Sequence, residues 1–201
     1  MKSLQNKTRP GFSLCLLGAL LLPAQPLAAS TVVAMDFADI SQRARHVICG
    51  RITSVVSEQD PLSGYIYSTV AVAVIEAVPA EYAGREYKFR TIGGQAGETT
   101  LAISDFPQLQ ADQGVVLFLQ GETATVFGPT VGLWQGVFFV ERDGSSGKET
   151  ITDHQGRRVL GVRNRQLIRG FGSASAESAP QGVGVKEFFD QVRAYRGAAG
   201  R

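Results

Sequence analysis

Cysteine and histidine are scarce in this chain, with two of each among 201 residues. Cys15 falls inside an N-terminal apolar run, so the rest of the chain holds Cys49 alone and cannot close an internal disulfide. His46 and His154 are too far apart in sequence to form one of the paired ligand motifs of zinc sites. The sequence also contains no Gly-x-Ser-x-Gly elbow, the turn that presents the nucleophile in α/β-hydrolases. These absences exclude a disulfide scaffold, a closely spaced zinc motif and that hydrolase signature.

A hydrophobic run long enough to span a bilayer is also missing. Phe12–Leu22 is an apolar run of 11 residues, whereas a membrane-spanning helix needs about 20. Basic residues precede this run, and the small residues Ala28 and Ala29 follow it, as at a signal-peptide cleavage site. We therefore expect residues 1–29 to be a cleaved signal peptide, and the alternative is a membrane anchor that stays attached. The chain would then be exported, either periplasmic or secreted, with no stable membrane span.

The excess of positive charge disappears with that segment. The whole chain has 20 Lys and Arg residues against 18 Asp and Glu residues. Residues 1–29 contain three basic residues and no acidic one, so the exported chain keeps 17 basic side chains against 18 acidic ones, a net charge of −1. This balance gives no electrostatic basis for binding nucleic acid or an anionic membrane surface.

The longest regular pattern is a hairpin over Val47–Val78. Its second strand alternates valines at 70, 72 and 74 with small or apolar residues, so both faces are apolar, which is typical of a strand covered on both sides or lining a narrow barrel. Gly50 interrupts the first strand and indicates a bulge or a sharp bend. The pattern predicts a mostly β fold with an OB-like or closed β-barrel.

Further strands and two helices complete this expectation. Strands are predicted at Arg85–Ile92, Val115–Leu119 and Gly136–Arg142, with hairpin turns at Gln120–Thr123 and Asp153–Gly156. Asp36 can cap a short helix over Phe37–Arg45, and the stripe Val185, Phe188, Phe189, Val192 and Tyr195 predicts an amphipathic C-terminal helix. The expected domains are a barrel over 30–171, a flexible spacer over 172–184 and a helix over 185–201 that docks on the barrel. The alternative for this helix is that it binds a partner.

Two segments are candidates for a binding site. Trp134, the only tryptophan, lies between glycines, and Gly93, Gly94, Gln95 and Gly97 belong to a glycine-rich segment that we interpret as a mobile loop. A phosphate-binding loop would need a following helix or a Lys-Ser/Thr ending, and the residues after Glu98 favour a strand instead. If Trp134 and this loop share one face, that face is the candidate site. The alternative for Trp134 is a place in the core.

Two resemblances rest on particular segments. Ala44–Ser57, Gly64–Val78 and Arg85–Thr91 resemble, in their order of features, the N-terminal barrel of tissue inhibitors of metalloproteinases and netrin-like modules, which implies an OB-type barrel. The inhibitory mechanism of that family uses an amino-terminal cysteine on zinc. The exported chain would begin at Ala29 or Ser30 and lacks the disulfides, so the mechanism does not carry over.

A second resemblance covers most of the exported chain. It is similar to a family of exported bacterial β-proteins that carries no activity with it. The matching segments are Gly50–Ile52, Ile66–Val74, Leu117–Leu119, Gly132–Phe138 and Phe188–Phe189.

Three functional hypotheses remain open. The first is a non-enzymatic binding module for another exported protein or an envelope ligand, with no cofactor, no metal ligands and no catalytic residues assigned. The second is a secreted module similar to a protease inhibitor. The third is a hydrolase or thiol enzyme that uses Cys49 or a pair of carboxylates. For Cys49 the simpler interpretation is a small buried hydrophobic residue.

Overall fold

The computed structural model describes residues 32–121, 128–142, 147–170 and 181–198. The chain divides into two units, residues 1–32 and 33–201, and nearly all described residues belong to the second. The expected signal peptide lies outside the described residues. So does most of the strand that was expected to follow the turn at Gln120–Thr123.

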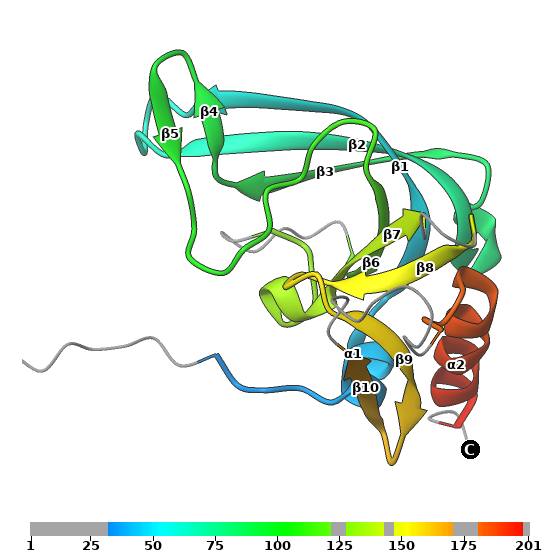
Figure 1. Ribbon diagram of the computed structural model, residues 1–201. Helices are drawn as coiled ribbons and strands as arrows, with labels where there is room; N and C mark the ends of the chain where they lie inside the picture. The colour runs from blue at the N-terminus through cyan, green and yellow to red at the C-terminus, as the bar shows by residue number, and fades with distance from the viewer. Residues whose placement is uncertain (1–31, 122–127, 143–146, 171–180, 199–201) are drawn as a thin grey trace, which may run out of the picture. The chain divides into compact units, whose positions relative to one another are not determined.

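Antiparallel strands dominate the second unit, which confirms the prediction of a mostly β fold (Figure 1). Eight strands form one sheet in the spatial order β10-β9-β8-β7-β6-β1-β2-β3. Their bounds are β1 (His46–Gln59), β2 (Ile66–Val78), β3 (Glu86–Ile92), β6 (Gly114–Leu119), β7 (Val137–Arg142), β8 (Glu149–Asp153), β9 (Arg158–Arg163) and β10 (Gln166–Gly170). A separate hairpin contains β4 (Gly94–Ala96) and β5 (Thr99–Leu101). Among the described residues no ladder joins β3 to β10, so closure of the sheet into a barrel stays a prediction.

The middle of the sheet is covered on both faces. In β6 the alternation of side chains sends Val116 and Phe118 into one core and Val115 and Leu117 into another. The first core contains the apolar side chains of both helices. The second lies against β2 and β3, and its largest members there are Val70, Val72, Val74, Tyr87 and Phe89. Strand β1 contributes residues to both cores. The doubly apolar second strand, β2, has Val70, Val72 and Val74 in the second core, but Ala73 and Ile75 are exposed, so this strand is not covered along both faces.

Two bulges lie in the β1–β2 pair. One is at Gly50, opposite Ile75, which has no partner on β1; the other is at Thr53, which has no partner on β2. The predicted irregularity at Gly50 is confirmed, and its cause is steric: a Cβ atom at this position would collide with the carbonyl oxygen of Ala73. Ile75 is the extra residue on β2, and it is exposed to solvent by 73%.

The short leading helix is α1 (Phe37–Arg43), close to the predicted Phe37–Arg45. Asp36 caps it, because its side chain accepts a hydrogen bond of 2.7 Å from the backbone N–H of Asp39. The guanidinium of Arg165, in the β9–β10 turn, holds the same carboxylate at 2.8 Å. This ion pair therefore joins the start of α1 to the β9–β10 hairpin, at one edge of the sheet.

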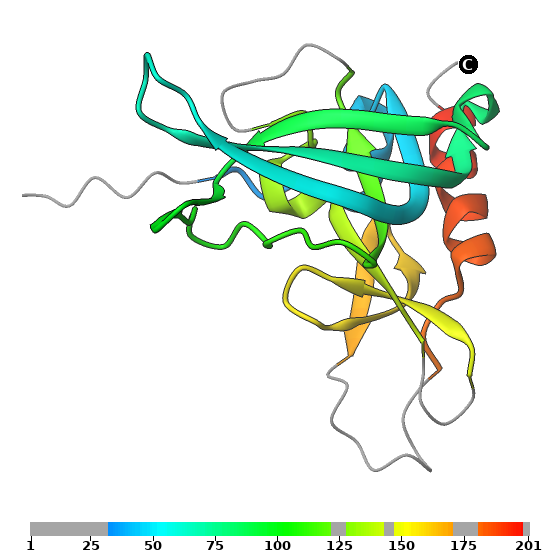
Figure 2. The ribbon, with the colours of Figure 1, turned by 90° about the horizontal axis from the view of Figure 1, so that it is seen from above.

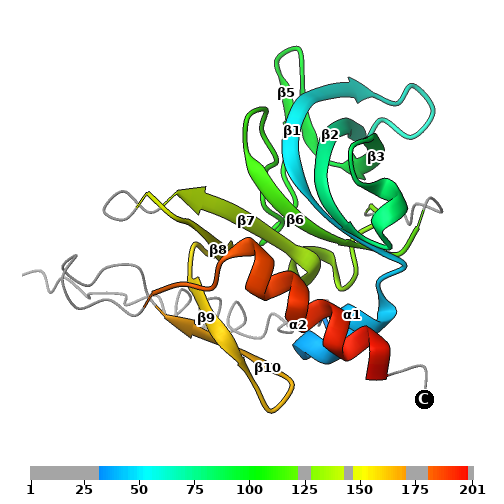
Figure 3. The ribbon, with the colours of Figure 1, turned by 90° about the vertical axis from the view of Figure 1, so that its right-hand side faces the viewer.

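The C-terminal helix is α2 (Val185–Ala198), and its apolar side chains belong to the first core (Figure 3). Phe188, Phe189 and Val192 are fully buried in the first core. Arg193 also forms an ion pair of 2.6 Å with Glu76 of β2. In the described part of the chain, no helix combines the length and the hydropathy needed to cross a membrane.

The end of the expected spacer is ordered against the sheet. Residues 172–180 lie outside the described residues, but Val183 is buried and its N–H donates to the carbonyl of Val159 at 2.7 Å. The N–H of Ile151 donates to the carbonyl of Val183 at 3.0 Å. Val183 of the expected spacer thus bonds to both β8 and β9.

The β9–β10 hairpin was not expected from the sequence. Its turn residues, Asn164 and Arg165, have φ angles of 50° and 68°. Two central residues with positive φ are typical of a type I′ turn, which usually contains glycine. This turn contains none, so the usual signal of a tight hairpin is absent.

Candidate functional site

The glycine-rich segment forms part of the β4–β5 hairpin, so its interpretation as a mobile loop is wrong. The hairpin lies beside the outer part of the β1–β2 hairpin (Figures 1 and 2). Gly93 and Gly94 have φ angles of 100° and 131°, which favour glycine. At Gly94 a Cβ atom would also collide with the hydroxyl groups of Ser57 and Ser68. Close approach of the backbone to these hydroxyls therefore requires glycine here.

A short relay of hydrogen bonds joins the two serines to this backbone. Ser68 donates its hydroxyl proton to the carbonyl of Gly93 at 2.6 Å. The Oγ atoms of Ser57 and Ser68 lie 2.8 Å apart. Because a hydroxyl has a single proton, and that of Ser68 is committed to the carbonyl, Ser57 must donate to Ser68. The Ser57 oxygen then has only lone pairs left to offer, so it can act toward a ligand as an acceptor.

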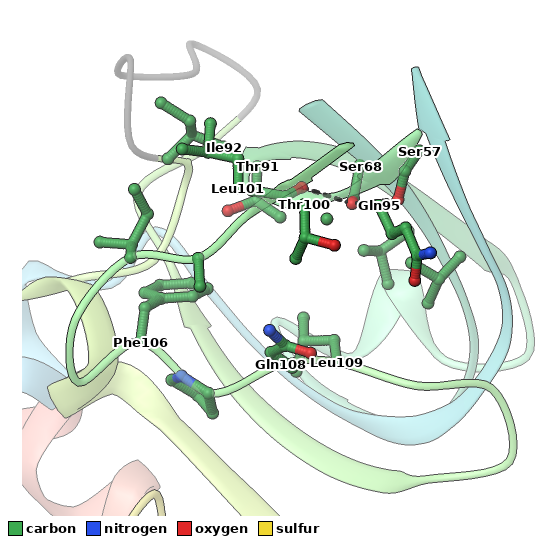
Figure 4. A pocket seen from close by; sticks show the side chains of 17 residues that line it. Ser57, Ser68, Thr91, Ile92, Gln95, Thr100, Leu101, Phe106, Gln108 and Leu109 are labelled. Carbon is green, nitrogen blue, oxygen red and sulfur yellow. Dashed lines mark hydrogen bonds between the residues drawn. The ribbon is translucent and has the colours of Figure 1, made fainter. Parts of the chain in front are cut away.

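These hydroxyls border a cavity of about 170 Å³, which we call the hydroxyl cavity (Figure 4). The sheet side contributes Ser57, Ser68 and Thr91, and the segment after β5 contributes Phe106 and Leu109 on the opposite side (Figure 4). Its full lining is Val55, Ser57, Ser68, Val70, Thr91, Ile92, Gly93, Gly94, Gln95, Thr100, Leu101, Ala102, Ile103, Phe106, Pro107, Gln108 and Leu109. The cavity therefore has one wall of hydroxyls and one apolar wall.

The lining of the hydroxyl cavity is uncharged. None of its residues is Asp, Glu, His, Lys, Arg or Cys, so no lining side chain titrates near neutral pH. Its inner wall is buried, while Gln95, Thr100 and Gln108 at the rim are exposed. A ligand can therefore enter the cavity from solvent, and the hydrogen-bonding groups that it meets there are uncharged.

The structure brings together three of the five predicted site residues. Gly93, Gly94 and Gln95 line the hydroxyl cavity. Gly97 forms the β4–β5 turn, where its carbonyl accepts a 3.3 Å hydrogen bond from the side-chain amide of Gln95. Trp134 does not line the cavity. Sequence reasoning missed the serines and Phe106, which no local motif marks, because their convergence depends on strand register.

Trp134 belongs to the 3-10 helix η2 (Leu133–Gly136) and is half-buried. Its indole ring lies 6.3 Å from the ring of His154. The neighbouring glycines have structural reasons: Gly132 has a φ of 63°, and a Cβ atom on Gly136 would meet the carbonyl of Val131 at 2.6 Å. Flanking glycine is therefore not by itself a sign of a binding site here.

Gln135, next to Trp134, fixes the segment that precedes α1. Its Oε1 accepts a 2.8 Å hydrogen bond from the N–H of Met35, and its Nε2 donates at 3.0 Å to the carbonyl of Val33. One side-chain amide thus imitates a strand pairing. The start of the described chain is attached to η2 rather than to the hydroxyl cavity.

Cys49 and His154, two of the groups considered for catalysis, have shifted pKa values. Cys49 is buried, and burial, together with the negative charges of Glu76 and Glu149, raises the pKa of its thiol to about 12. The thiol is therefore protonated at neutral pH and is a poor nucleophile. His154 lies in the predicted turn, and its pKa is lowered, chiefly by burial. Residues 32–121, 128–142, 147–170 and 181–198 contain no group of three His, Cys, Asp or Glu residues that could hold a metal ion.

Asp153 is a buried carboxylate that the sequence did not single out from the others. Arg157 and Arg169 approach its Oδ2 to 2.6 and 2.9 Å, and its Oδ1 accepts hydrogen bonds of 3.0 Å from the N–H groups of Gln155 and Arg157. Burial alone would raise the pKa of this carboxyl, but these hydrogen bonds and charges lower it. Asp153 thus organises the β8–β9 turn, and its oxygens are already occupied.

Comparisons with known proteins identified no relative of this chain. No family model, no curated protein and no solved structure matches the chain.

Proposed function

We propose that this chain is an exported, non-enzymatic binding module, and that the hydroxyl cavity receives one uncharged side chain of a partner protein. The observation that carries the proposal is the lining, which combines hydroxyls and apolar groups without any titratable side chain. General acid–base catalysis needs a group that exchanges a proton near the working pH. A neutral, amphipathic lining instead favours recognition of a neutral, amphipathic group.

The size of the cavity supports a single side chain rather than a whole small-molecule ligand. Sites for drug-sized ligands have volumes of about 300–1,000 Å³. An engineered apolar cavity of about 150 Å³ in another protein holds one benzene molecule. At about 170 Å³, the hydroxyl cavity matches one aromatic ring or one branched aliphatic side chain.

The hydrogen-bond relay narrows the choice of side chain. Ser57 can only accept, so the complementary group is an uncharged donor at the end of an apolar body. Tyrosine has this combination: its ring can lie against Phe106 and Leu109, and its phenol can donate to Ser57. We therefore propose a partner that presents a tyrosine.

The test is a titration of the purified protein, followed by ¹H–¹⁵N NMR, with N-acetyl-L-tyrosinamide and N-acetyl-L-phenylalaninamide. One neutral hydrogen bond contributes about 1 kcal/mol, so the tyrosine compound should bind about fivefold more tightly. Ser57→Ala should abolish this preference and leave the affinity for the phenylalanine compound unchanged. Ser54→Ala, on the same strand but outside the lining, is the control.

The outcomes separate clearly. Shifts confined to cavity residues, with a preference that depends on Ser57, would support the proposal. Absence of binding at millimolar concentration, or a preference that persists in Ser57→Ala, would contradict it.

We also propose that the β1–β2–β3–β6 part has the OB-like closure that the resemblance to netrin-like modules implies. Two contacts support this: Thr130 bridges Leu119 of β6, and a Cβ atom on Gly128 would meet the Thr91 hydroxyl of β3 at 2.8 Å. The segment 128–130 thus contacts the β6 and β3 sides together. Nuclear Overhauser effects between Gly128 and Thr91 should be strong, and their absence would argue for an open sheet.

A further inference from the structure

The free edge of the β4–β5 hairpin lies at the rim of the hydroxyl cavity. The strands pair with the register Gly94↔Leu101, Gln95↔Thr100 and Ala96↔Thr99. Gly97 has a φ of 60° at the first position of the two-residue turn, as in a type II′ hairpin. In such a hairpin the pair that closes the turn is hydrogen-bonded, and bonded and non-bonded pairs then alternate. Gln95 and Thr100 therefore form a non-bonded pair.

It follows that the N–H and C=O groups of Thr100 point away from β4. Across the described ranges, no backbone hydrogen bond outside the β4–β5 pair engages Thr100. Thr100 is exposed, and its side chain lines the hydroxyl cavity. One residue thus offers a free backbone donor, a free backbone acceptor and part of the cavity rim.

This edge also lacks the charged side chains that usually block strand edges. β5 carries Thr99, Thr100 and Leu101, all uncharged. By contrast, β3, at one edge of the main sheet, presents Glu86, Lys88 and Arg90 as exposed residues. Inward or edge charges are a common protection against pairing with a further strand. The main sheet edge has this protection and the edge of β5 does not.

We infer that the partner binds as an extended segment that adds a strand to β5 at Thr100. This inference rests on the proposed binding function of the hydroxyl cavity. In an antiparallel pair, directly opposite side chains lie on the same face, with Cβ atoms about 4.5–5.5 Å apart. The partner residue that exchanges backbone hydrogen bonds with Thr100 therefore points its side chain to the cavity face. Strand addition supplies affinity through the backbone, and the cavity supplies the choice of side chain.

The inference predicts which backbone amide of the partner matters. The probe is the capped tripeptide acetyl-Ala-Tyr-Ala-amide, titrated into the purified protein and followed by ¹H–¹⁵N NMR. Methylation of the tyrosine nitrogen removes the donor that faces Thr100 and should weaken binding at least tenfold. Methylation of the first alanine nitrogen is the matched control, because neighbouring N–H groups along a strand point to opposite sides, and it should leave the affinity within twofold.

Hydrogen exchange gives a second, independent measurement. The amide proton of Thr100 should exchange at least tenfold more slowly when the tripeptide is bound, whereas that of Gln95 should be unaffected. If the three peptides bind equally and the Thr100 amide is not protected, strand addition is refuted while the cavity still binds tyrosine. If no peptide and no tyrosine amide binds, both the inference and the proposed function fail.

Discussion

Replacing Phe188 with alanine should be among the most damaging changes in the chain. Its side chain is completely buried, and its ring centroid lies 5.2, 6.1 and 5.3 Å from those of Phe37, Phe118 and Phe138. Phe-to-Ala substitutions in cores cost about 3–5 kcal/mol, and each aromatic pair contributes about 0.5–1.5 kcal/mol beyond its buried area. We therefore expect the free energy of unfolding to fall by about 4 kcal/mol.

The assay is equilibrium unfolding in urea, followed by fluorescence and far-UV circular dichroism. With a slope of about 2 kcal/mol per molar, the midpoint should fall by about 2 M. Lys186→Ala, on the exposed side of the same helix, is the control and should change stability by less than about 0.5 kcal/mol. A loss below about 1 kcal/mol for Phe188→Ala would refute the reasoning that α2 is an integral part of the first core.

Three further changes test other parts of the structure. Gly50→Ala should lower the free energy of unfolding by about 1–3 kcal/mol, because the new Cβ atom would collide with Ala73. Gly197→Ala, on α2 where a Cβ atom meets nothing, is the control and should leave that free energy unchanged or raise it by up to about 1 kcal/mol. Both are measured from urea unfolding midpoints. The pKa of Asp153 is lower in the folded protein, so its contribution to stability is present above its unfolded pKa and is lost as the pH falls through the folded pKa. Asp153→Asn should therefore reduce the loss of thermal stability between pH 7 and pH 2, measured by thermal melts. An unchanged pH profile would contradict the assignment. Gln135→Ala should speed hydrogen exchange at the Met35 amide, while Gln135→Glu, which keeps the acceptor, should largely preserve its protection.

Local patterns predicted the elements that depend on local physics. Asp36 identified the start of α1, and the stripe of Phe188, Phe189 and Val192 identified both α2 and its buried face. Gly50 marked a bulge because only glycine tolerates the approach of the neighbouring strand. Each of these signals depends on a few consecutive residues.

The candidate site depended on information that a single sequence does not display. The glycines at 93 and 94 drew attention to the correct segment, but they were interpreted as mobile, whereas they allow a backbone to lie against two serines. Ser57 and Ser68 face each other only because the register of β1 and β2 pairs them. A serine within a strand has no sequence signature of this kind. For Trp134 the flanking glycines suggested a binding site, whereas backbone conformation and close packing explain why glycine occupies these positions.

The two bulges of the β1–β2 pair have opposite effects on register. The unpaired Ile75 shifts β2 by one residue relative to β1, and the unpaired Thr53 shifts it back. Ser57 and Ser68 therefore pair in the same register as Val47 and Val78. Deleting either residue alone would remove that bulge and leave the residue pairs on both sides of it in place, because each bulge is a single extra residue on one strand. Deleting both would also leave Ser57 opposite Ser68, but the ladder would lose both local kinks. The hairpin can therefore lose the extra residue at either bulge without turning its other side chains to the opposite face.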